Sequence, residues 1–328
     1  MPGRVFITRP IPDIGPRLIE EVADEVEIFP HDRPMTRTEL LDAVQGRDGV
    51  LCMLTDRIDA EVLDAAQGCR IFANMAVGYN NLDIPAATDR GILLTNTPGI
   101  LTEATADLTW TLILSVARRV VEGDLEMRSG RFPGWGPRYM LGADVSGQTL
   151  GLVGPGRIAL AVAQRAIGFT MRILYTGRRV ESSFEALGAA KVPLEELLQQ
   201  SDFVSLHVPL TETTYHLIDA KALGLMKSTA CLINTSRGPV VDERALVDAL
   251  RSGQIAGAGL DVYEREPQMA QGLAECANTV LLPHLGSATR GTRNAMARKA
   301  AANLNDALRG RRPADLLNPE AWRDPPHS

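Results

Sequence analysis

The feature that most constrains the fold is a regular alternation of short apolar runs with longer amphipathic segments. Such alternation is typical of parallel α/β units, in which a helix connects each strand to the next. The pattern predicts helices at residues 36–46 and 55–68, the second capped by Thr55 and Asp56. It predicts strands in the first third of the chain at residues 4–9, 26–29, 49–54, 70–77 and 92–96. These elements amount to one complete α/β domain.

A second series of strands is predicted after residue 147. The strands are expected at residues 148–154, 171–177, 202–208, 230–236, 255–262 and 278–283. Six parallel strands with helices between them fit a doubly wound dinucleotide-binding domain. Because 328 residues are enough for two domains of ordinary size, the sequence predicts two Rossmann-like α/β domains, each built on a doubly wound parallel sheet.

The two series are joined by a predicted apolar helix over about residues 102–121. Residues 128–147 follow it and are rich in glycine, proline and aromatic side chains. The helix is apolar on more than one face, so we expect it to be buried against a second copy of the chain. Burial inside a single chain is the alternative. A further helix is predicted over residues 288–310, and it could return to pack on the first domain.

Composition argues against several classes of protein. The net charge is −6, so the chain lacks the basic excess that binding to nucleic acid requires. Cys52, Cys69, Cys231 and Cys276 show no paired short spacing, which favours buried thiols over a metal site or disulfides. The apolar runs are too short to span a bilayer, and the first residues lack the apolar core of a signal peptide. We therefore expect a cytoplasmic protein without a nucleic-acid or membrane partner.

The stretch LGLVGPGRIALAVAQRA at residues 150–166 has the context of a dinucleotide-binding loop, because a predicted strand precedes it and a helix follows. Gly154 would permit the tight turn, and Gly156 would let a pyrophosphate approach the backbone. Arg157 and Ile158 would begin the helix, whose first amides face the anion. The stretch therefore predicts a nucleotide cofactor.

The end of the next strand indicates which cofactor. In an NAD site, an acidic residue about 20 positions further on binds the ribose hydroxyls. Here the corresponding residues are Thr176, Gly177, Arg178 and Arg179, and none of them is a carboxylate. A guanidinium matches a phosphate in charge and geometry, so this ending favours NADP(H), with NAD(H) still possible. The alternative is that the two arginines only form a solvated turn.

Three residues could support the reduction of a 2-oxo acid, which needs a cation, a proton donor and a hydride donor. Arg237, Glu266 and His284 each follow one of the last three predicted strands. Ligands of doubly wound folds bind outside the carboxyl ends of the strands, so all three are expected at that edge. Spacing does not decide whether Glu266 reaches His284. His207 and His216 are expected to be structural, because the sequence indicates no acid–base partner for them.

The order of these motifs resembles the D-isomer-specific 2-hydroxyacid dehydrogenases, and most closely their glyoxylate and hydroxypyruvate reductase branch. The resemblance covers nearly the whole chain. It rests on the glycine loop, NTSRG, GLDVYEREP, LPHLGSATRGTRNAM, residues 77–108 and WGPRYMLGADVSGQTLGLVG. The sequence departs from the family pattern at Ala159, which replaces a third glycine, and at Pro155, which removes an amide that might have faced the phosphate.

The resemblance implies a discontinuous substrate-binding domain, residues 1–100 with 287–328. An NAD(P)-binding Rossmann domain, residues 101–286, would be inserted into it and would include a dimerisation segment at residues 101–147. The protein would then be a homodimer. Trp135 could close over the substrate of the neighbouring subunit or simply pack in the dimer, and the same holds for Tyr139.

The resemblance also implies roles for individual residues. Arg237 would bind the substrate carboxylate and carbonyl, and His284 would be the proton donor. Glu266 would orient the imidazole and favour its protonated form. The remaining implied substrate contacts are Leu54, Val77, Gly78 and Ser287. The remaining implied cofactor contacts are Thr102 near the cofactor, Thr235 and Ser236 along it, and Asp261 at the nicotinamide amide. Val208 and Pro209 are expected to form a wall of the adenine pocket.

The activity implied by the resemblance is NADPH-dependent reduction of glyoxylate and hydroxypyruvate to glycolate and D-glycerate. A reductase of a larger 2-oxo acid, such as 2-ketogluconate, is an alternative because related branches share these motifs. A nucleotide-sensing, corepressor-like binding protein is an alternative from another class, because fold and intact residues do not prove turnover.

Overall fold

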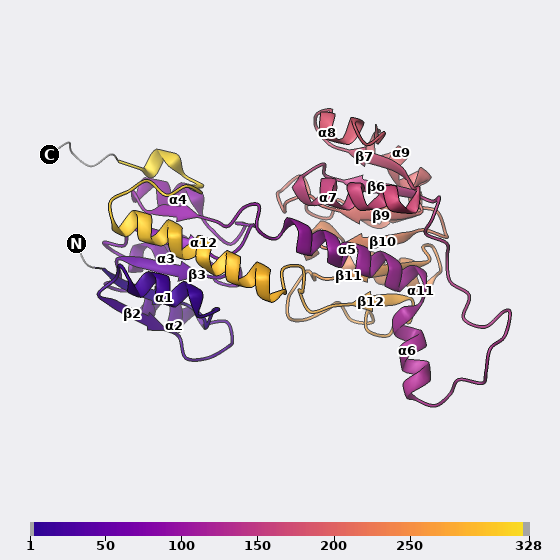
Figure 1. The fold of residues 1–328 in the computed structure, drawn as a ribbon, viewed down its shortest axis with the longest axis horizontal. Coiled ribbons are helices and arrows are strands. Elements are labelled where there is room, and N and C mark those ends of the chain that lie inside the picture. The colour runs from indigo at the N-terminus through magenta and orange to yellow at the C-terminus, as the bar shows by residue number, and fades with distance from the viewer. Residues whose placement is uncertain (1–2, 324–328) are drawn as a thin grey trace. The chain divides into compact units, whose positions relative to one another are not determined.

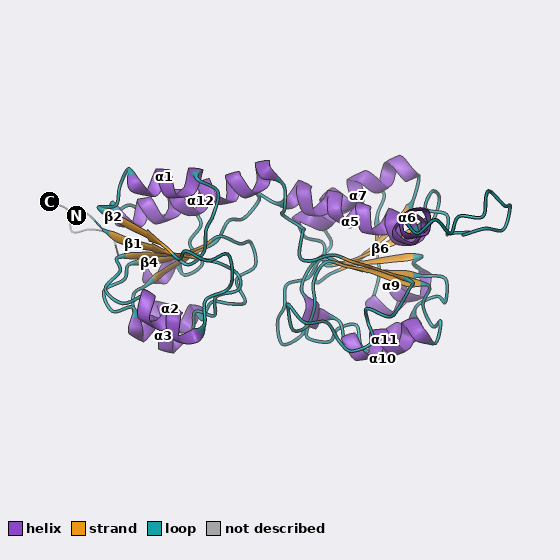
Figure 2. Cartoon of the chain, turned by 90° about the horizontal axis from the view of Figure 1, so that it is seen from below, coloured by secondary structure: helices purple, strands orange, loops and turns teal. Residues whose placement is uncertain are grey.

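The computed structural model describes residues 3–323, and the chain divides into two compact units (Figure 1). Unit 1 comprises residues 1–101 and 289–328, and unit 2 comprises residues 102–288. Each unit contains one parallel β-sheet, with helices on both of its faces (Figure 2). The predicted fold class of two parallel-sheet α/β domains is therefore confirmed.

Unit 1 has five parallel strands in the order β2-β1-β3-β4-β5. Their bounds are β1 Arg4–Ile7, β2 Glu25–Ile28, β3 Gly49–Cys52, β4 Ile71–Asn74 and β5 Leu93–Thr95. The helices are α1 Ile14–Glu20, α2 Arg37–Ala43, α3 Ala60–Ala65, α4 Ile84–Asp89 and α12 Arg290–Leu308, and a 3₁₀ turn spans Pro319–Ala321. Buried aliphatic side chains of the strands supply the core on both faces.

Helix α12 packs on the first domain, as the sequence predicts. Its residues Met296, Ala300 and Leu304 are buried in the same cluster as the strand residues of unit 1. It lies beside α1 in Figures 1 and 2, where a side chain at Gly15 would approach within 3.3 Å of Ala297. The close approach of the two helices thus explains a glycine in the first turn of α1.

The predicted cap of α3 is wrong. Helix α3 begins later, and Asp59 caps it by accepting a hydrogen bond from the Val62 amide at 3.3 Å. Asp56 is instead buried, where it accepts hydrogen bonds from the Thr8 hydroxyl at 2.5 Å and the Met53 amide at 2.7 Å. Burial raises the pKa of Asp56 above its usual range. Asp56 therefore fixes the loop after β3 rather than a helix.

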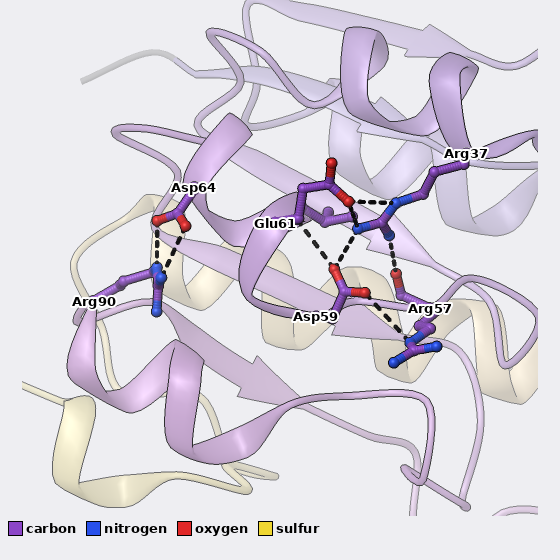
Figure 3. Close-up of polar contacts among 7 residues, drawn as sticks. Arg37, Arg57, Asp59, Glu61, Asp64 and Arg90 are labelled. Carbon is purple, nitrogen blue, oxygen red and sulfur yellow. Dashed lines mark hydrogen bonds and ion pairs between the residues drawn. The ribbon is translucent and has the colours of Figure 1, made fainter.

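Surface ion pairs join the helices on one face of unit 1 (Figure 3). Arg37 of α2 bonds Asp59 at 2.5 Å and also bonds Glu61 of α3. Arg90, at the end of α4, bonds Asp64 of α3 at 2.8 Å and holds the pKa of that carboxyl below its usual range. These groups are partly or largely exposed, so solvent screens the ion pairs and they contribute little to stability.

Unit 2 has seven parallel strands in the order β12-β11-β10-β9-β6-β7-β8. They are β6 Thr149–Val153, β7 Arg172–Thr176, β8 Ala190–Lys191, β9 Phe203–Leu206, β10 Cys231–Asn234, β11 Gly257–Leu260 and β12 Thr279–Leu281. All six predicted strands are present, and the short edge strand β8 is an addition. The helices are α5 Thr102–Ala117, α6 Val120–Arg128, α7 Arg157–Ala166, α8 Ser182–Glu185, α9 Leu194–Gln200, α10 Ala220–Leu225 and α11 Glu243–Arg251, with 3₁₀ turns at Ile167–Phe169 and Gly238–Val240.

The single helix predicted over residues 102–121 is wrong, because α5 ends at Ala117 and α6 begins at Val120. Arg119 between them has a left-handed backbone with φ of 52°. The Ala117 carbonyl accepts a hydrogen bond from the Ala143 amide at 2.8 Å, so the returning chain binds the end of α5. Helix α5 is largely buried within its own unit, where the indole of Trp110 donates to the Val162 carbonyl at 3.0 Å. Much of α5 is therefore buried inside its own chain, and its burial against a second copy stays a prediction.

Two other observations bear on the composition argument. The four cysteines are all buried and free, as predicted. Within residues 3–323, no helix is both long enough and apolar enough to cross a membrane.

Candidate active site

The glycine loop after β6 has the geometry that the sequence predicts. Gly154 has a φ of +95°, and a Cβ atom there would lie 2.9 Å from the His207 carbonyl oxygen. A Cβ atom on Gly156 would have no neighbour within 4 Å, so the space beside this residue is open. Helix α7 begins at Arg157, and its first backbone amides lack intrahelical acceptors. An open glycine before a helix N-terminus fits the pyrophosphate of a dinucleotide.

Pro155 connects the glycine loop to the loop after β7. A Cβ atom on Gly177 would lie 2.5 Å from Pro155 Cδ, so only glycine lets the proline ring lie this close. Arg178 and Arg179 follow and are exposed. Ala159 is fully buried in the first turn of α7, so the small side chain allows close packing of the helix on the sheet. Neither departure from the family pattern disturbs the loop.

The other predicted cofactor residues lie along the carboxyl edge of the unit 2 sheet or at the start of α5. Thr102 is the first residue of α5, whereas Val208 and Pro209, Thr235 and Ser236, and Asp261 follow β9, β10 and β11. The Thr235 hydroxyl is 3.0 Å from the Thr109 hydroxyl of α5. The Ser236 hydroxyl donates to Asn234 Oδ1 at 2.8 Å. The structure thus places all of these residues except Thr102 at one edge of one sheet.

Arg237 follows β10 in a tightly constrained segment. Its carbonyl accepts from the side-chain amide of Asn234 at 3.0 Å, and its guanidinium donates to the Ser236 carbonyl at 2.8 Å. The next residue is Gly238, where a Cβ atom would lie 1.8 Å from the Tyr263 carbonyl carbon. The segment therefore crosses directly against the loop that carries Glu266. Burial lowers the pKa of Arg237, and the charge of Glu266 opposes that shift.

Glu266 and His284 are hydrogen-bonded. Glu266 Oε2 is 2.9 Å from His284 Nδ1, and Oε1 accepts from the Tyr263 amide at 3.1 Å. Burial tends to raise the pKa of Glu266, but the bond to His284, the amide bond and the charge of Arg237 outweigh it and lower the pKa. Glu266 is therefore ionised at neutral pH. A carboxylate at Nδ1 favours the proton on that nitrogen and leaves Nε2 for a reacting molecule.

The backbone around His284 is also held in place. His284 has a left-handed φ of 56°, which is uncommon for a residue other than glycine. Both oxygens of Asp261 bind the turn that follows, accepting from the Leu285 amide at 2.6 Å and the Gly286 amide at 2.8 Å. Burial raises the pKa of Asp261, and these bonds and the charge of His284 oppose the shift. Asp261 thus fixes the His284 turn, a role that the sequence does not indicate.

The predicted substrate residues lie in two groups. Leu54 follows β3 and the pair Val77 and Gly78 follows β4, and these two strands are neighbours in the unit 1 sheet. Ser287 belongs to unit 2, directly after the His284 turn, and is buried. Leu54, Val77 and Gly78 therefore lie at the carboxyl edge of one sheet.

Residues 110–286 match the family model of the D-isomer specific 2-hydroxyacid dehydrogenase, NAD binding domain. The chain belongs to the D-isomer-specific 2-hydroxyacid dehydrogenase family. It is 51% identical to a glyoxylate reductase of Thermococcus kodakarensis over 98% of this chain and 97% of the relative. It therefore is an NAD(P)-dependent oxidoreductase, and the predicted family and glyoxylate reductase branch are confirmed.

Solved structures share the fold over nearly the full chain or all of it. A protein of Thermus thermophilus is 46% identical with a TM-score of 0.89, covering 96% of this chain and 99% of the other. An NADPH-dependent glyoxylate/hydroxypyruvate reductase of Sinorhizobium meliloti, solved with NADP and malonate, is 32% identical with a TM-score of 0.87 and full coverage of both chains.

Two further histidines of this dehydrogenase have partners in unit 2. His207 Nε2 is 2.9 Å from the Ser205 hydroxyl, and burial lowers the pKa of His207 to about 3, so this ring is neutral at neutral pH. His216 Nε2 is 2.6 Å from Glu264 Oε1. His216 therefore has a carboxylate partner that the sequence does not indicate, because the partner comes from a distant loop. His216 and His284 both pair with a glutamate.

Proposed function

We propose that this dehydrogenase reduces glyoxylate and hydroxypyruvate to glycolate and D-glycerate, with NADPH as the preferred reductant. The observation that carries the proposal is the 2.9 Å pair of Glu266 and His284, with Arg237 beside it, at the edge that also bears the glycine loop. Relatives named glyoxylate reductase support the substrate. The relative that is solved with NADP supports the cofactor.

The proposed mechanism assigns one task to each side chain. Arg237 binds the substrate carboxylate and polarises the adjacent carbonyl, and arginine stays charged at neutral pH. His284 donates the Nε2 proton to the carbonyl oxygen. Before this transfer, Glu266 stabilises the charged imidazolium through its contact with Nδ1. A nicotinamide cofactor held by the glycine loop would supply the hydride that the reduction needs. The backbone amides of Val77 and Gly78, with Leu54 and Ser287, are proposed to complete the substrate contacts.

The experiment that tests the proposal follows the absorbance of NADPH and, separately, NADH with the purified protein. Glyoxylate, hydroxypyruvate, pyruvate and 2-ketogluconate are offered in parallel. Rapid oxidation of NADPH with the first two acids supports the proposal. A preference for 2-ketogluconate would favour the reductase of a larger acid, and binding of NADPH without turnover of any acid would favour a nucleotide sensor.

The cofactor preference predicts the effect of replacing Thr176 with aspartate. A carboxylate at the end of β7 would bind ribose hydroxyls and repel a 2′-phosphate. We expect the ratio of kcat/KM for NADPH to that for NADH to fall about 10- to 100-fold. This is the change in affinity that corresponds to one hydrogen bond to a charged group. Thr170→Asp is the control, because it adds the same charge on an exposed residue before the amino end of β7. An unchanged ratio in Thr176→Asp would exclude this assignment.

We propose further that the protein is a homodimer, formed through α6 and the chain that follows it. Helix α6 has no buried residue, and large apolar side chains along this part of unit 2 are exposed. They are Val120, Val121, Leu125, Met127, Phe132, Trp135 and Leu141. Trp135 is 86% exposed, and such apolar patches mark interaction sites. The chain after α6 extends away from the unit 2 sheet in Figures 1 and 2.

Sedimentation equilibrium tests the homodimer. The wild-type protein should sediment with twice the chain mass, and Trp135→Ser combined with Leu141→Ser should shift it toward a monomer, because the patch loses its largest apolar area. Ile167→Ser removes an apolar side chain that is also exposed but lies outside this segment, so it should remain dimeric. A monomeric wild-type protein at micromolar concentration would argue against the homodimer.

The four buried thiols are suited to a reducing compartment, which supports a cytoplasmic location as part of the proposal.

A further inference from the structure

Two buried asparagines of unit 1 bind the peptide segment that is proposed to receive the substrate carboxylate. Asn96 Nδ2 donates to the Val77 carbonyl at 2.8 Å, and Asn74 Nδ2 donates to the Gly78 carbonyl at 3.1 Å. Asn74 is fully buried and Asn96 is only 7% exposed. Two consecutive carbonyls after β4 are thus turned toward side-chain amides of their own unit.

These bonds also set the direction of the amides. In a trans peptide, the N–H of the following residue points opposite to the carbonyl, and the bonds in this segment are trans. The bond from Asn96 to the Val77 carbonyl therefore turns the Gly78 N–H away from Asn96. The Ala76 carbonyl accepts from the Thr97 amide at 2.8 Å, which fixes the Val77 N–H in the same way. Successive N–H groups of this kind form anion-binding concavities.

The strand register explains why the two asparagines meet this segment. Asn74 is the last residue of β4, and Asn96 follows the end of β5. Ala73 pairs with Thr95 in the parallel ladder, so the next residues, Asn74 and Asn96, leave the sheet side by side. The Asn303 side chain of α12 donates to the Asn96 carbonyl at 3.3 Å, which fixes its backbone from the other side.

A third asparagine extends the arrangement to the loop of Leu54. Asn81 Nδ2 donates to the Met53 and Asp56 carbonyls, at 3.1 Å in each case. Asn81 Oδ1 in turn lies 3.4 Å from Asn74 Nδ2. The loops after β3 and β4 are therefore connected through side-chain amides.

We propose that Asn74 and Asn96 are positioning residues that hold the Val77 and Gly78 segment with its amides toward the carboxylate of a 2-oxo acid. Asn96 does so by turning the Gly78 N–H, and Asn74 does so by holding the Gly78 carbonyl in place. The inference rests on the proposed function and deepens it. The amide NH₂ group is essential to this role, because an oxygen in its place would repel the carbonyl that it now binds. The asparagines act through the backbone and are not themselves substrate ligands.

The test measures three quantities in Asn96→Ser, Asn96→Asp and Asn74→Ser. They are the KM for glyoxylate, the dissociation constant of oxalate from the NADPH-loaded protein, and the dissociation constant of NADPH. We expect the first two to rise about 10- to 100-fold, because one charge-assisted anchor weakens. The affinity for NADPH should stay unchanged, and kcat should fall less than KM rises, because the lost interaction is equal in the ground and transition states.

Asn318→Ser is the matched control. Asn318 is also fully buried in unit 1 and bonds backbone groups with its side chain, donating to the Ile92 carbonyl at 2.8 Å and accepting from the Leu94 amide at 2.8 Å. Its replacement should lower thermal stability to a similar extent yet leave KM and oxalate affinity as in the wild type. This comparison separates positioning from general loss of stability.

The outcomes distinguish this inference from the proposed function. If the wild type reduces glyoxylate and the folded Asn96 and Asn74 variants keep wild-type KM and oxalate affinity, the inference is overturned alone. An increase in KM that Asn318→Ser reproduces would also overturn it. If the wild type oxidises NADPH with none of the 2-oxo acids, the proposed function itself fails, and the inference fails with it.

Discussion

Replacing His284 with alanine should lower kcat for glyoxylate reduction roughly 10²- to 10⁴-fold, the usual range for the loss of a general acid. The reason is geometric. Glu266 Oε2 lies 2.9 Å from Nδ1, and Asp261 fixes the turn that follows. These contacts hold the imidazole in one orientation, so Nε2 faces one direction. The affinity for NADPH should be little changed, because the glycine loop and α7 are untouched. Steady-state kinetics with saturating NADPH measures the effect.

The pair of Glu266 and His284 should behave as a unit. Glu266→Gln alone should lower kcat. In the double variant with His284→Ala, the decrease in kcat should be far smaller than the product of the two single decreases. His216→Gln is the matched control, because His216 also pairs with a glutamate, at 2.6 Å, but is assigned no role in the reaction. It should keep kcat within a few-fold of the wild type. A His284→Ala variant of nearly full activity would refute the mechanism.

The alternation of apolar runs predicts the strands because buried parallel strands consist almost entirely of apolar residues. It gives no signal for β8, whose two residues are exposed at the edge of the sheet. It gives little signal for α1 and α4, which are short and carry a proline in the first turn, where helices tolerate it. At the break between α5 and α6, the Ala117 carbonyl accepts from the amide of the distant Ala143, a contact that local sequence could not indicate.

The candidate site also has a part that the sequence predicts and a part that it does not. Strand ends place Arg237, Glu266 and His284 at one edge, because parallel strands share a direction. The contact of Glu266 with His284 needs the left-handed backbone of His284 and the two amide bonds of Asp261, which the spacing does not contain. Asn74, at the end of β4, is equally invisible in a single sequence, because nothing there shows that its amide binds a backbone carbonyl.

Replacing Arg237 with alanine should lower kcat/KM for glyoxylate about 10²- to 10³-fold, the range for truncating one member of a buried charge pair. Arg237 is proposed to act on the carboxylate and on the carbonyl, so both KM and kcat should change, unlike in the asparagine variants. Arg237→Lys should recover only part of the loss, because an ammonium keeps the charge but lacks the two-pronged geometry. Arg251→Ala, which removes an exposed arginine paired with Glu275, is the control.

The same substitution should act on the neighbouring carboxylate. The charge of Arg237 is one of the effects that lower the pKa of Glu266, so its removal should raise that pKa. A raised pKa means that Glu266 is protonated at a less acidic pH, and the variant should therefore lose activity on the acid side earlier than the wild type. Adding guanidinium ion to Arg237→Ala should restore part of kcat/KM for glyoxylate if the lost cation is the cause. Guanidinium should leave the control Arg251→Ala unchanged, and an Arg237→Ala variant with nearly wild-type kcat/KM for glyoxylate would contradict the proposed role of Arg237.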